Sequence, residues 1–374
     1  MTGKASSALL STFLLLLSTG ACGGEAFAPA RGSPYRAGSR PSSVVTADFN
    51  TDGRLDILAV CSGSDSVALL LNDGRGGFGP CRTFPAIAGP HLMAVGDFNG
   101  DRKPDVVVSA HDANEIVLLR NDGRGNLERM SPVTAFDGGK PHNHGLAVGD
   151  LNEDGRADVT VGHQELGSIA VLLGDGRYGF RPAPGSPVAV GRAPYPHTLA
   201  DVNGDRHLDL VVPDVQGNRI RLFAGDGQGR FRPLPAVSTG IERPYFVLAR
   251  DVNRDGAADL IVTHDDTHRV AALLGDGRGG FHHAPTSPFE GRAASWKGDV
   301  ADLNGDGKVD LALAGGGSIR VFDGDGRGGF RFRTSLSTRG ESWDVTLTDV
   351  NGDKRPDVVT PSGTAGAVHV FLAP

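Results

Sequence analysis

The chain has 374 residues, of which 55 are Gly and 23 are Pro, and only 6% are aromatic. Hydrophobic residues make up 39% of the chain, which is enough for a core, so the composition argues against wholesale disorder, and the many turn formers argue against a large helical protein. The formal net charge of −7 argues against the basic surface of a general nucleic-acid binder, so we expect no nucleic-acid partner.

The first predicted element is a secretory signal peptide over residues 1–21. Lys4 precedes an apolar run, Leu9–Leu17, and small residues then lead to Cys22. A positive start, a short apolar run and a small-residue exit are typical of such a peptide, and the run is too short for a spanning helix of about 20 apolar residues. We therefore expect an exported protein.

Two cleavage patterns follow the apolar run. Thr19–Cys22 resembles a bacterial lipobox, which would make Cys22 the lipidated first residue of the mature protein, although Thr19 stands where Leu is usual. Ala26–Ala28 offers an ordinary cleavage site instead. The two alternatives predict a lipoprotein of the cell envelope or outer membrane, or a secreted protein, with residues 22–26 as a short linker. Contact with a membrane is expected only through the lipid.

One loop pattern, Asp-x-Asn-x-Asp-x-x-x-Asp, then occurs seven times, and successive copies start 47 to 53 residues apart. Each copy is followed by a β-type run such as Ile57–Val60. About 24 residues after a loop begins, an apolar pair precedes Asp-Gly-x-Gly-x-Phe or a close variant, as at Asp73–Phe78. Asp-Gly between apolar runs is a strong hairpin signal because Gly accepts a positive φ. The copies begin at Asp48, Asp97, Asp150, Asp201, Asp251, Asp302 and Asp349.

Each repeat therefore predicts four short strands, and four strands repeated radially form a β-propeller. The chain ends favour a closed ring over a linear solenoid. The seventh repeat stops at Pro374 before its last strand, and the segment from Phe27 to Asp48 has the 21-residue length that a last strand and its exit have in the third repeat. We expect an all-β, seven-bladed propeller of four-stranded antiparallel blades over residues 27–374, in which the N-terminal strand completes the last blade. Cys61 and Cys81 would fall on strands that are not neighbours, about 10 Å apart, which disfavours a disulfide.

The loop pattern places Asp at positions 1, 5 and 9 and Asn at position 3. Calcium takes six to eight oxygen ligands in tolerant geometry, whereas zinc and copper prefer His or Cys, which the pattern lacks. The loop is no EF-hand, because position 12 is apolar and strands flank it. Turn formation alone is the alternative, but a turn needs only one or two such residues. We expect up to seven calcium ions, held by Asp48, Asn50, Asp52 and Asp56; Asp97, Asn99, Asp101 and Asp105; Asp150, Asn152, Asp154 and Asp158; Asp201, Asn203, Asp205 and Asp209; Asp251, Asn253, Asp255 and Asp259; Asp302, Asn304, Asp306 and Asp310; Asp349, Asn351, Asp353 and Asp357.

The copies differ at position 6, which is Gly in four of them. Arg102, Arg206 and Lys354 stand there in the other three, which carry Gly at position 4 instead. A nearby cation and the loss of freedom to adopt a positive φ predict weaker calcium binding in these three loops.

The loop pattern, the β run and the Asp-Gly turn at this period resemble the FG-GAP/VCBS repeat family, which is related to the propeller of the integrin α-subunit. The resemblance covers Phe27 to Pro374. It implies a seven-bladed propeller with calcium loops, at the cell surface or outside the cell. Members of the family include adhesins, lectins and some carbohydrate-active enzymes, so the fold leaves the function open.

A second register lies six residues before each loop. It holds both Trp and two of the four Tyr of the chain, and the period places it at the mouth of the central channel, on the face opposite the calcium loops. The residues expected to join it from the ends of the second strands are His111-Asp112, His163, Asp214 and His264-Asp265. Aromatic walls with a few polar groups are typical of ligand pockets, so we expect a glycan or protein ligand there. Packing at the channel mouth is one alternative, and a metal centre of His91, His144, His163 and His264 is another. The register comprises Ser42, His91, His144, Tyr195, Tyr245, Trp296 and Trp343.

The sequence contains no Gly-x-Ser-x-Gly, His-Glu-x-x-His or P-loop motif. We therefore favour a monomeric, non-enzymatic module for binding or adhesion. The alternative is a carbohydrate-active enzyme, lyase-like, that uses His and Tyr at the channel mouth as acid and base. A structural surface protein without a specific small ligand is a third reading.

Overall fold

The computed structural model describes residues 26–374 except 141, 265, 266 and 294. The predicted signal peptide, the predicted lipidation of Cys22 and most of the predicted linker lie outside the described residues. Every regular element in the described part of the chain is a β-strand. Accordingly, no helix there is long and apolar enough to cross a membrane.

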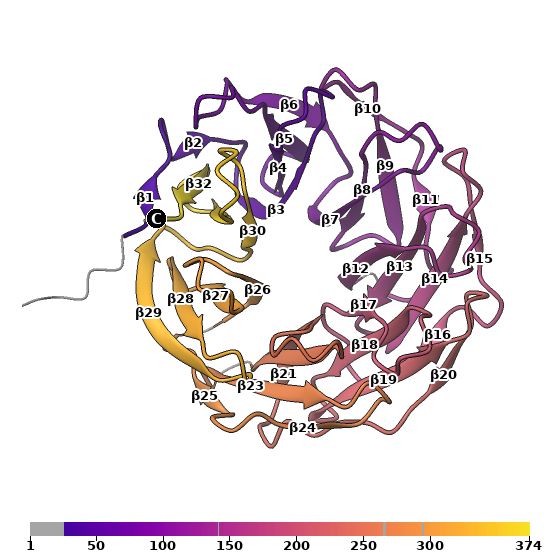
Figure 1. The fold of residues 1–374 in the computed structure, drawn as a ribbon. Coiled ribbons are helices and arrows are strands. Elements are labelled where there is room, and N and C mark those ends of the chain that lie inside the picture. Colours follow the sequence, from indigo (N-terminus) through magenta and orange to yellow (C-terminus); the bar gives the residue numbers. More distant parts are fainter. Residues whose placement is uncertain (1–25, 141, 265–266, 294) are drawn as a thin grey trace, which may run out of the picture.

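Seven antiparallel sheets stand around a common centre, and the innermost strand of each sheet borders that centre (Figure 1). This confirms the predicted all-β, seven-bladed propeller. Each of the first six blades is a run of consecutive strands from the centre outward, so that each blade corresponds to one repeat of the sequence. Short extra strands pair with the third strand of the second, third and fifth blades.

The strand bounds follow the repeats. The first blade contains β3 (Pro41–Ala47), β4 (Asp56–Cys61), β5 (Ser66–Leu70) and β6 (Arg82–Pro85). The second contains β7 (Pro90–Gly96), β8 (Asp105–Ala110), β9 (Glu115–Asn121), β10 (Leu127–Arg129) and β11 (Val133–Thr134). The third contains β12 (Asn143–Gly149), β13 (Asp158–His163), β14 (Ser168–Gly174), β15 (Phe180–Pro182) and β16 (Val188–Ala189). The fourth contains β17 (Thr198–Ala200), β18 (Asp209–Asp214), β19 (Arg219–Gly225) and β20 (Phe231–Pro233).

The fifth blade contains β21 (Pro244–Arg250), β22 (Asp259–His264), β23 (Arg269–Gly275), β24 (Phe281–His283) and β25 (Phe289–Glu290). The sixth contains β26 (Lys297–Ala301), β27 (Asp310–Gly315), β28 (Ser318–Gly324) and β29 (Phe330–Ser337). The seventh contains β30 (Thr346–Thr348), β31 (Asp357–Ser362), β32 (Ala367–Leu372), β1 (Ala28–Pro29) and β2 (Tyr35–Arg36).

The seventh blade contains both ends of the described chain. The N-terminal strands β1 and β2 pair antiparallel with the C-terminal strand β32, with Ala28 opposite Leu372 and Tyr35 opposite Val368. In Figure 1 the indigo β1 lies beside the yellow β32. The N-terminal strands thus cover the edge of β32 that would otherwise be unpaired.

The core lies between neighbouring blades. All six residues of β4 are buried, and they alternate between the two sides of the sheet. Leu58 and Val60 pack in one cluster with the second blade, while Ile57 and Ala59 pack in another with the seventh. The second strands are buried along their whole length because both of their faces are covered. Cys61 and Cys81 are both free thiols.

The Asp loops and the Asp-Gly turns lie on the same face, where they join neighbouring blades. The residue at loop position 2 is buried in every loop, and in the first four loops its carbonyl accepts a hydrogen bond from an N–H of the Asp-Gly turn of the next blade. In the first loop, Phe49 is fully buried and its carbonyl accepts from the N–H of Gly125 at 2.9 Å. In the second loop, the carbonyl of Phe98 accepts from the N–H of Tyr178 at 3.2 Å. In the third loop, the carbonyl of Leu151 accepts from the N–H of Gly229 at 2.9 Å.

Candidate functional site

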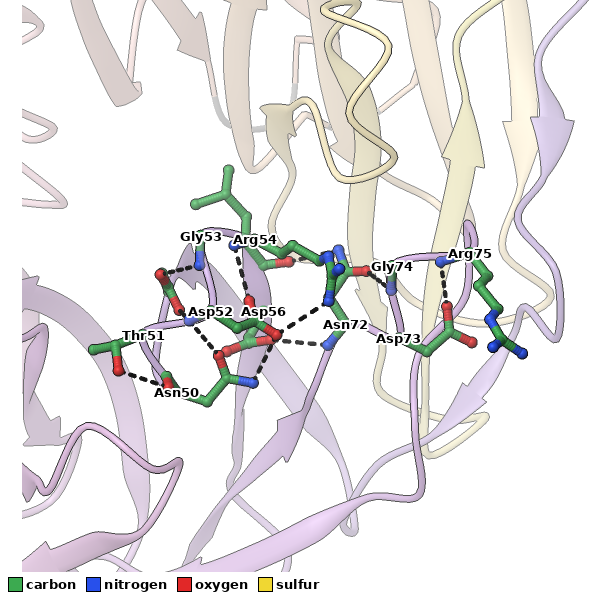
Figure 2. Close-up of polar contacts among 12 residues, drawn as sticks. Asn50, Thr51, Asp52, Gly53, Arg54, Asp56, Asn72, Asp73, Gly74 and Arg75 are labelled. Atoms are coloured by element: carbon green, nitrogen blue, oxygen red, sulfur yellow. Dashed lines mark hydrogen bonds and ion pairs between the residues drawn. The ribbon is translucent and has the colours of Figure 1, made fainter.

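Each Asp loop is held by hydrogen bonds from its own backbone. In the first loop, Asp48 accepts from the N–H of Asp52 at 3.0 Å and from the N–H of Gly53 at 2.7 Å. Asp52 in turn accepts from the N–H of Arg54 at 2.9 Å, as Figure 2 shows. The carboxylates at positions 1 and 5 therefore shape the turn, and their outer lone pairs stay available to a cation.

Loop positions 4 and 6 have a positive φ in all seven copies. Thr51 and Gly53 have φ values of 59° and 84° in the first loop. Where Gly is absent from position 6, Arg102, Arg206 and Lys354 still adopt φ values of 65°, 75° and 69°. The absence of Gly therefore does not remove the positive φ from these three loops, and their weaker calcium binding stays a prediction. They keep the same backbone at a steric cost of about 1–2 kcal/mol per residue.

The carboxylate at loop position 9 is fully buried in every copy. Asp158 is representative: its two oxygens accept hydrogen bonds at 2.8 Å from the N–H of Leu151, at loop position 2, and of Gly174, at the end of β14. Figure 2 shows the corresponding contact between Asp56 and Asn72. This side chain therefore fastens the loop to the third strand, a role that the spacing pattern alone did not reveal.

Burial raises the pKa of several of these carboxyls. The pKa values of Asp56, Asp158, Asp310 and Asp357 are about 6, because loss of solvation outweighs the two backbone N–H donors. In Asp158 the neighbouring carboxylates at positions 5 and 1 raise the pKa further. A divalent cation in the loop would relieve this repulsion.

The donor set fits calcium, because every side-chain donor of the pattern offers oxygen. Basic residues at position 7 compete for the position 5 carboxylate in four loops, and two of these pairs are Arg54 with Asp52 at 3.4 Å and Lys103 with Asp101 at 3.2 Å. Such exposed pairs are weak, so a divalent ion can displace them. In the described residues the loop carboxylates are held by backbone N–H groups, and no three of them bring their oxygens within 4.8 Å of one another.

The register six residues before each loop forms a continuous row of rings on the opposite face. The register lies at or just before the innermost strands, whereas the Asp loops follow their ends. Ring centroids are 5.4 Å apart for His91 and His144, and 4.7 Å for His144 and Tyr195. They are 4.6 Å for Tyr195 and Tyr245, 5.1 Å for Tyr245 and Trp296, and 4.6 Å for Trp296 and Trp343. Six of the seven predicted positions thus form the row of rings, and the seventh, Ser42 of β3, lines the cavity beside that row.

Five rings of this row, all except Tyr195, line a cavity of about 560 Å³. Tyr245, Trp296 and Trp343 line it together with His91 and His144, and the Trp343 side chain is 37% exposed. Its charged lining comprises Arg40, Lys297 and Glu341.

The ammonium of Lys297 has a buried counter-ion. Its Nζ donates to Asp344 at 3.0 Å, and Asp344 also accepts from Ser43 Oγ at 2.7 Å. The seventh and first blades therefore fix this ammonium beside the aromatic wall.

The two histidines of the cavity are held neutral. Burial, the neighbouring His111 and Lys297 lower the pKa of His91 to about 4. Burial and the neighbouring histidines lower the pKa of His144 to about 3. Both imidazoles therefore offer lone pairs at neutral pH rather than positive charge.

His163 and His264 do not join this cavity. Both are buried at the ends of second strands. His163 accepts from the N–H of Leu166 at 3.2 Å, and His264 Nε2 is 2.8 Å from Thr239 Oγ1. Their predicted place at the channel mouth, and in a metal centre with His91 and His144, is therefore corrected, because neither lines the cavity.

The structure instead adds His111 and His142 beside His144. His111 follows β8 and was expected near the mouth, whereas His142, just before β12, was missed. The only signal for His142 was its spacing of two residues from His144, which places both side chains on one side of an extended segment.

Comparison with known proteins agrees with the repeat architecture. Six segments match the FG-GAP-like repeat family: residues 48–108, 97–161, 150–212, 201–262, 251–313 and 302–360. No curated protein matches the sequence.

Many solved structures share the fold at low identity. The BBS1N chain of a complex with ARL6DN, soaked with lead, is 13% identical with a TM-score of 0.67, and the match covers 93% of this chain and 97% of that one. An Agrocybe aegerita lectin that recognises non-reducing terminal N-acetylglucosamine is 20% identical with a TM-score of 0.56, covering 85% and 88%. A catalytically inactive virginiamycin B lyase from Staphylococcus aureus, solved with quinupristin, is 12% identical with a TM-score of 0.58, covering 92% and 97%. At these identities the likeness shows the fold alone.

Proposed function

The chain belongs to the FG-GAP-like repeat family, and from that premise we propose that it is a binding module that holds a carbohydrate in its aromatic cavity. Calcium in the Asp loops of the opposite face would stabilise the ring. The observation that carries the proposal is the continuous row of six rings from His91 to Trp343. Five of these rings line a cavity of about 560 Å³.

The size and lining of the cavity favour a small polar ligand with an apolar face. Ligand pockets have volumes of about 300–1,000 Å³ and combine apolar walls with a few polar groups. The faces of Trp296 and Trp343 suit the C–H face of a sugar ring, while the neutral imidazoles of His91 and His144 and the Lys297 ammonium suit its hydroxyls or a carboxylate. A flat protein surface would fill such a cavity less completely than a small ligand. We therefore favour a glycan over a protein as the ligand.

Calcium would act in this module as a structural ion. The residues that would hold it are the loop carboxylates and amide oxygens, represented by Asp48, Asn50 and Asp52 in the first loop. An ion that binds the folded loop alone stabilises the fold by mass action, at about 2.7 kcal/mol per site when its concentration is one hundred times its Kd. Loops on one face would thus fix the blades that present the ligand site on the other.

The place of action that we propose is outside the cytoplasm. The apolar run before Cys22 supports export, and calcium-dependent loops suit a compartment where calcium is abundant. A glycan-binding propeller at the cell envelope or in the medium would serve attachment or capture of carbohydrate.

A glycan array tests the proposal. The protein, saturated with calcium, is applied to an array of neutral, amino-sugar and uronic-acid glycans, and we expect selective retention that Trp343→Ala reduces at least tenfold. Leu166→Ala is the matched control, because Leu166 is a 47% exposed apolar side chain outside the cavity, and it should bind like the unmodified protein. No retention, or equal loss in both variants, would count against the proposal. Release of cleaved sugar from a retained glycan would favour the lyase-like alternative.

A further inference from the structure

Three histidines of the second and third blades converge at the edge of the cavity. His111 follows β8, and His142 and His144 flank the start of β12. One ring nitrogen from each lies within 4.8 Å of the other two, the only such group of His, Cys, Asp or Glu among the described residues. The Nε2 atoms of His142 and His144 are 2.9 Å apart.

Acidic side chains orient two of the three rings. His111 Nδ1 is 2.7 Å from Asp112 Oδ1, and His142 Nδ1 is 3.3 Å from Glu165 Oε1. An acceptor on Nδ1 fixes the proton there and leaves Nε2 with a free lone pair. This arrangement of carboxylate, imidazole and outward Nε2 is the one that metal-ligating histidines use in proteins.

Two ring nitrogens of the cluster face each other. With Nδ1 protonated, His142 Nε2 can only accept, so its 2.9 Å contact requires His144 to donate from Nε2. His91 borders the group, with its ring centroid 5.3 Å from that of His111, and its buried Nδ1 has no hydrogen-bond partner. A cation bound by His111, His142 and His144 would use the lone pairs of ring nitrogens that lie close to one another in this cluster.

We propose that His111, His142 and His144 bind one divalent transition-metal ion of the zinc class through their ring nitrogens. Zinc–nitrogen bonds of about 2.0–2.1 Å in a tetrahedral site place the ligand nitrogens roughly 3.3 Å apart, which lies between the 2.9 Å contact and the 4.8 Å limit of the cluster. Three histidines leave a fourth position open, and His144, which also lines the cavity, places that position at the cavity's edge.

A zinc ion can reach the three histidines from solvent, and the calcium loops do not compete with them for it. The side chains of His111 and His142 are 35% and 27% exposed, so solvent reaches the ligands. Imidazole nitrogens suit zinc, copper or nickel, whereas calcium prefers oxygen, and the Asp loops lie at the other ends of the inner strands. The open position would take water or an oxygen atom of the ligand in the cavity.

Zinc titration of the full chain in excess calcium tests this site. Isothermal titration calorimetry with zinc chloride should show one zinc per chain with a Kd below 1 μM, and His142→Ala should weaken binding at least one-hundredfold. Glu165→Gln keeps the three ligands and alters only the orienting acceptor, so it should weaken binding roughly tenfold, within the range typical of such partners. His282→Ala, which changes an exposed histidine of β24, is the matched control and should not change the Kd.

Cobalt provides a second readout, because its absorption depends on the metal ligands and would not change if the histidines only stabilised the fold. Substitution of Co²⁺ should give the intense visible absorption of a four-coordinate site, which His142→Ala abolishes while the melting temperature in calcium shows that the variant is folded. The proposal is overturned if zinc does not bind stoichiometrically in calcium, or if His142→Ala and His144→Ala retain the affinity of the unmodified protein. Glycan retention measured without zinc is a separate result, so failure of the metal site and failure of the proposed function are distinguishable.

Discussion

Replacement of Asp158 by Asn tests the role of the position 9 carboxylate in holding each blade together. Asp158 is fully buried, and both of its oxygens accept backbone hydrogen bonds at 2.8 Å. Asn keeps the shape but turns an NH₂ group toward one of the two N–H donors. A lost hydrogen bond to a charged group costs about 1.5–3 kcal/mol, and a buried N–H left without an acceptor costs about 1–3 kcal/mol. Asn carries no charge, so the variant avoids the cost of burying one, which offsets part of this loss. We therefore expect the free energy of unfolding to fall by about 2–4 kcal/mol.

Urea unfolding of the chelator-treated protein at pH 7.5 measures this loss without any contribution from calcium. Asp154→Asn is the matched control, because Asp154 lies in the same loop at position 5, is more exposed, and accepts only local hydrogen bonds, from the N–H of Arg156 at 3.0 Å and from Asn152 Nδ2 at 3.1 Å. It should cost less than about 1 kcal/mol. A change at Asp158 below 0.5 kcal/mol, or no larger than the change at Asp154, would refute the reasoning.

Two further predictions concern the same loops. Because the folded-state pKa of Asp158 is about 6 and its ordinary value is 3.8, its contribution to stability is fully present below pH 3.8 and is lost as the pH rises through 6. The chelated protein should therefore melt at a higher temperature at pH 5 than at pH 7.5, and calcium at pH 7.5 should raise the melting temperature and remove this difference; an unchanged melting curve with and without chelator would contradict filled loops. Arg102→Gly should raise the free energy of unfolding by about 0.5–1 kcal/mol, because Arg102 has a φ of 65°, and chemical denaturation that shows a loss instead would contradict strain at that position.

The repeat period alone was enough to predict most of the fold and the aromatic row of the candidate site. A constant offset from the loop start corresponds to one structural position in every blade, so His91, Tyr195 and Trp343 could be placed on one ring before any contact was known. The same logic gave the strand order, because each repeat contains one hairpin turn and one loop at fixed places.

What the period could not supply were the contacts that cross between strands and blades. His163 and His264 are the last residues of second strands, and such strands are covered on both faces, so these side chains are enclosed rather than exposed at the channel. The partner of Asp158 on β14 lies 16 residues away and is a backbone N–H, which no side-chain pattern reveals. His142 lies in a connection between blades, and only the fold brings it against His111.

Intrinsic tryptophan fluorescence tests the central claim most directly, because both tryptophans of the chain, Trp296 and Trp343, line the cavity. Titration of the calcium-loaded protein with the glycan most strongly retained on the array should change the emission in a saturable manner, with one ligand per chain and a Kd that matches the array. Binding of the same glycan, measured by calorimetry, with no change in tryptophan emission would place the ligand elsewhere on the propeller and contradict the account.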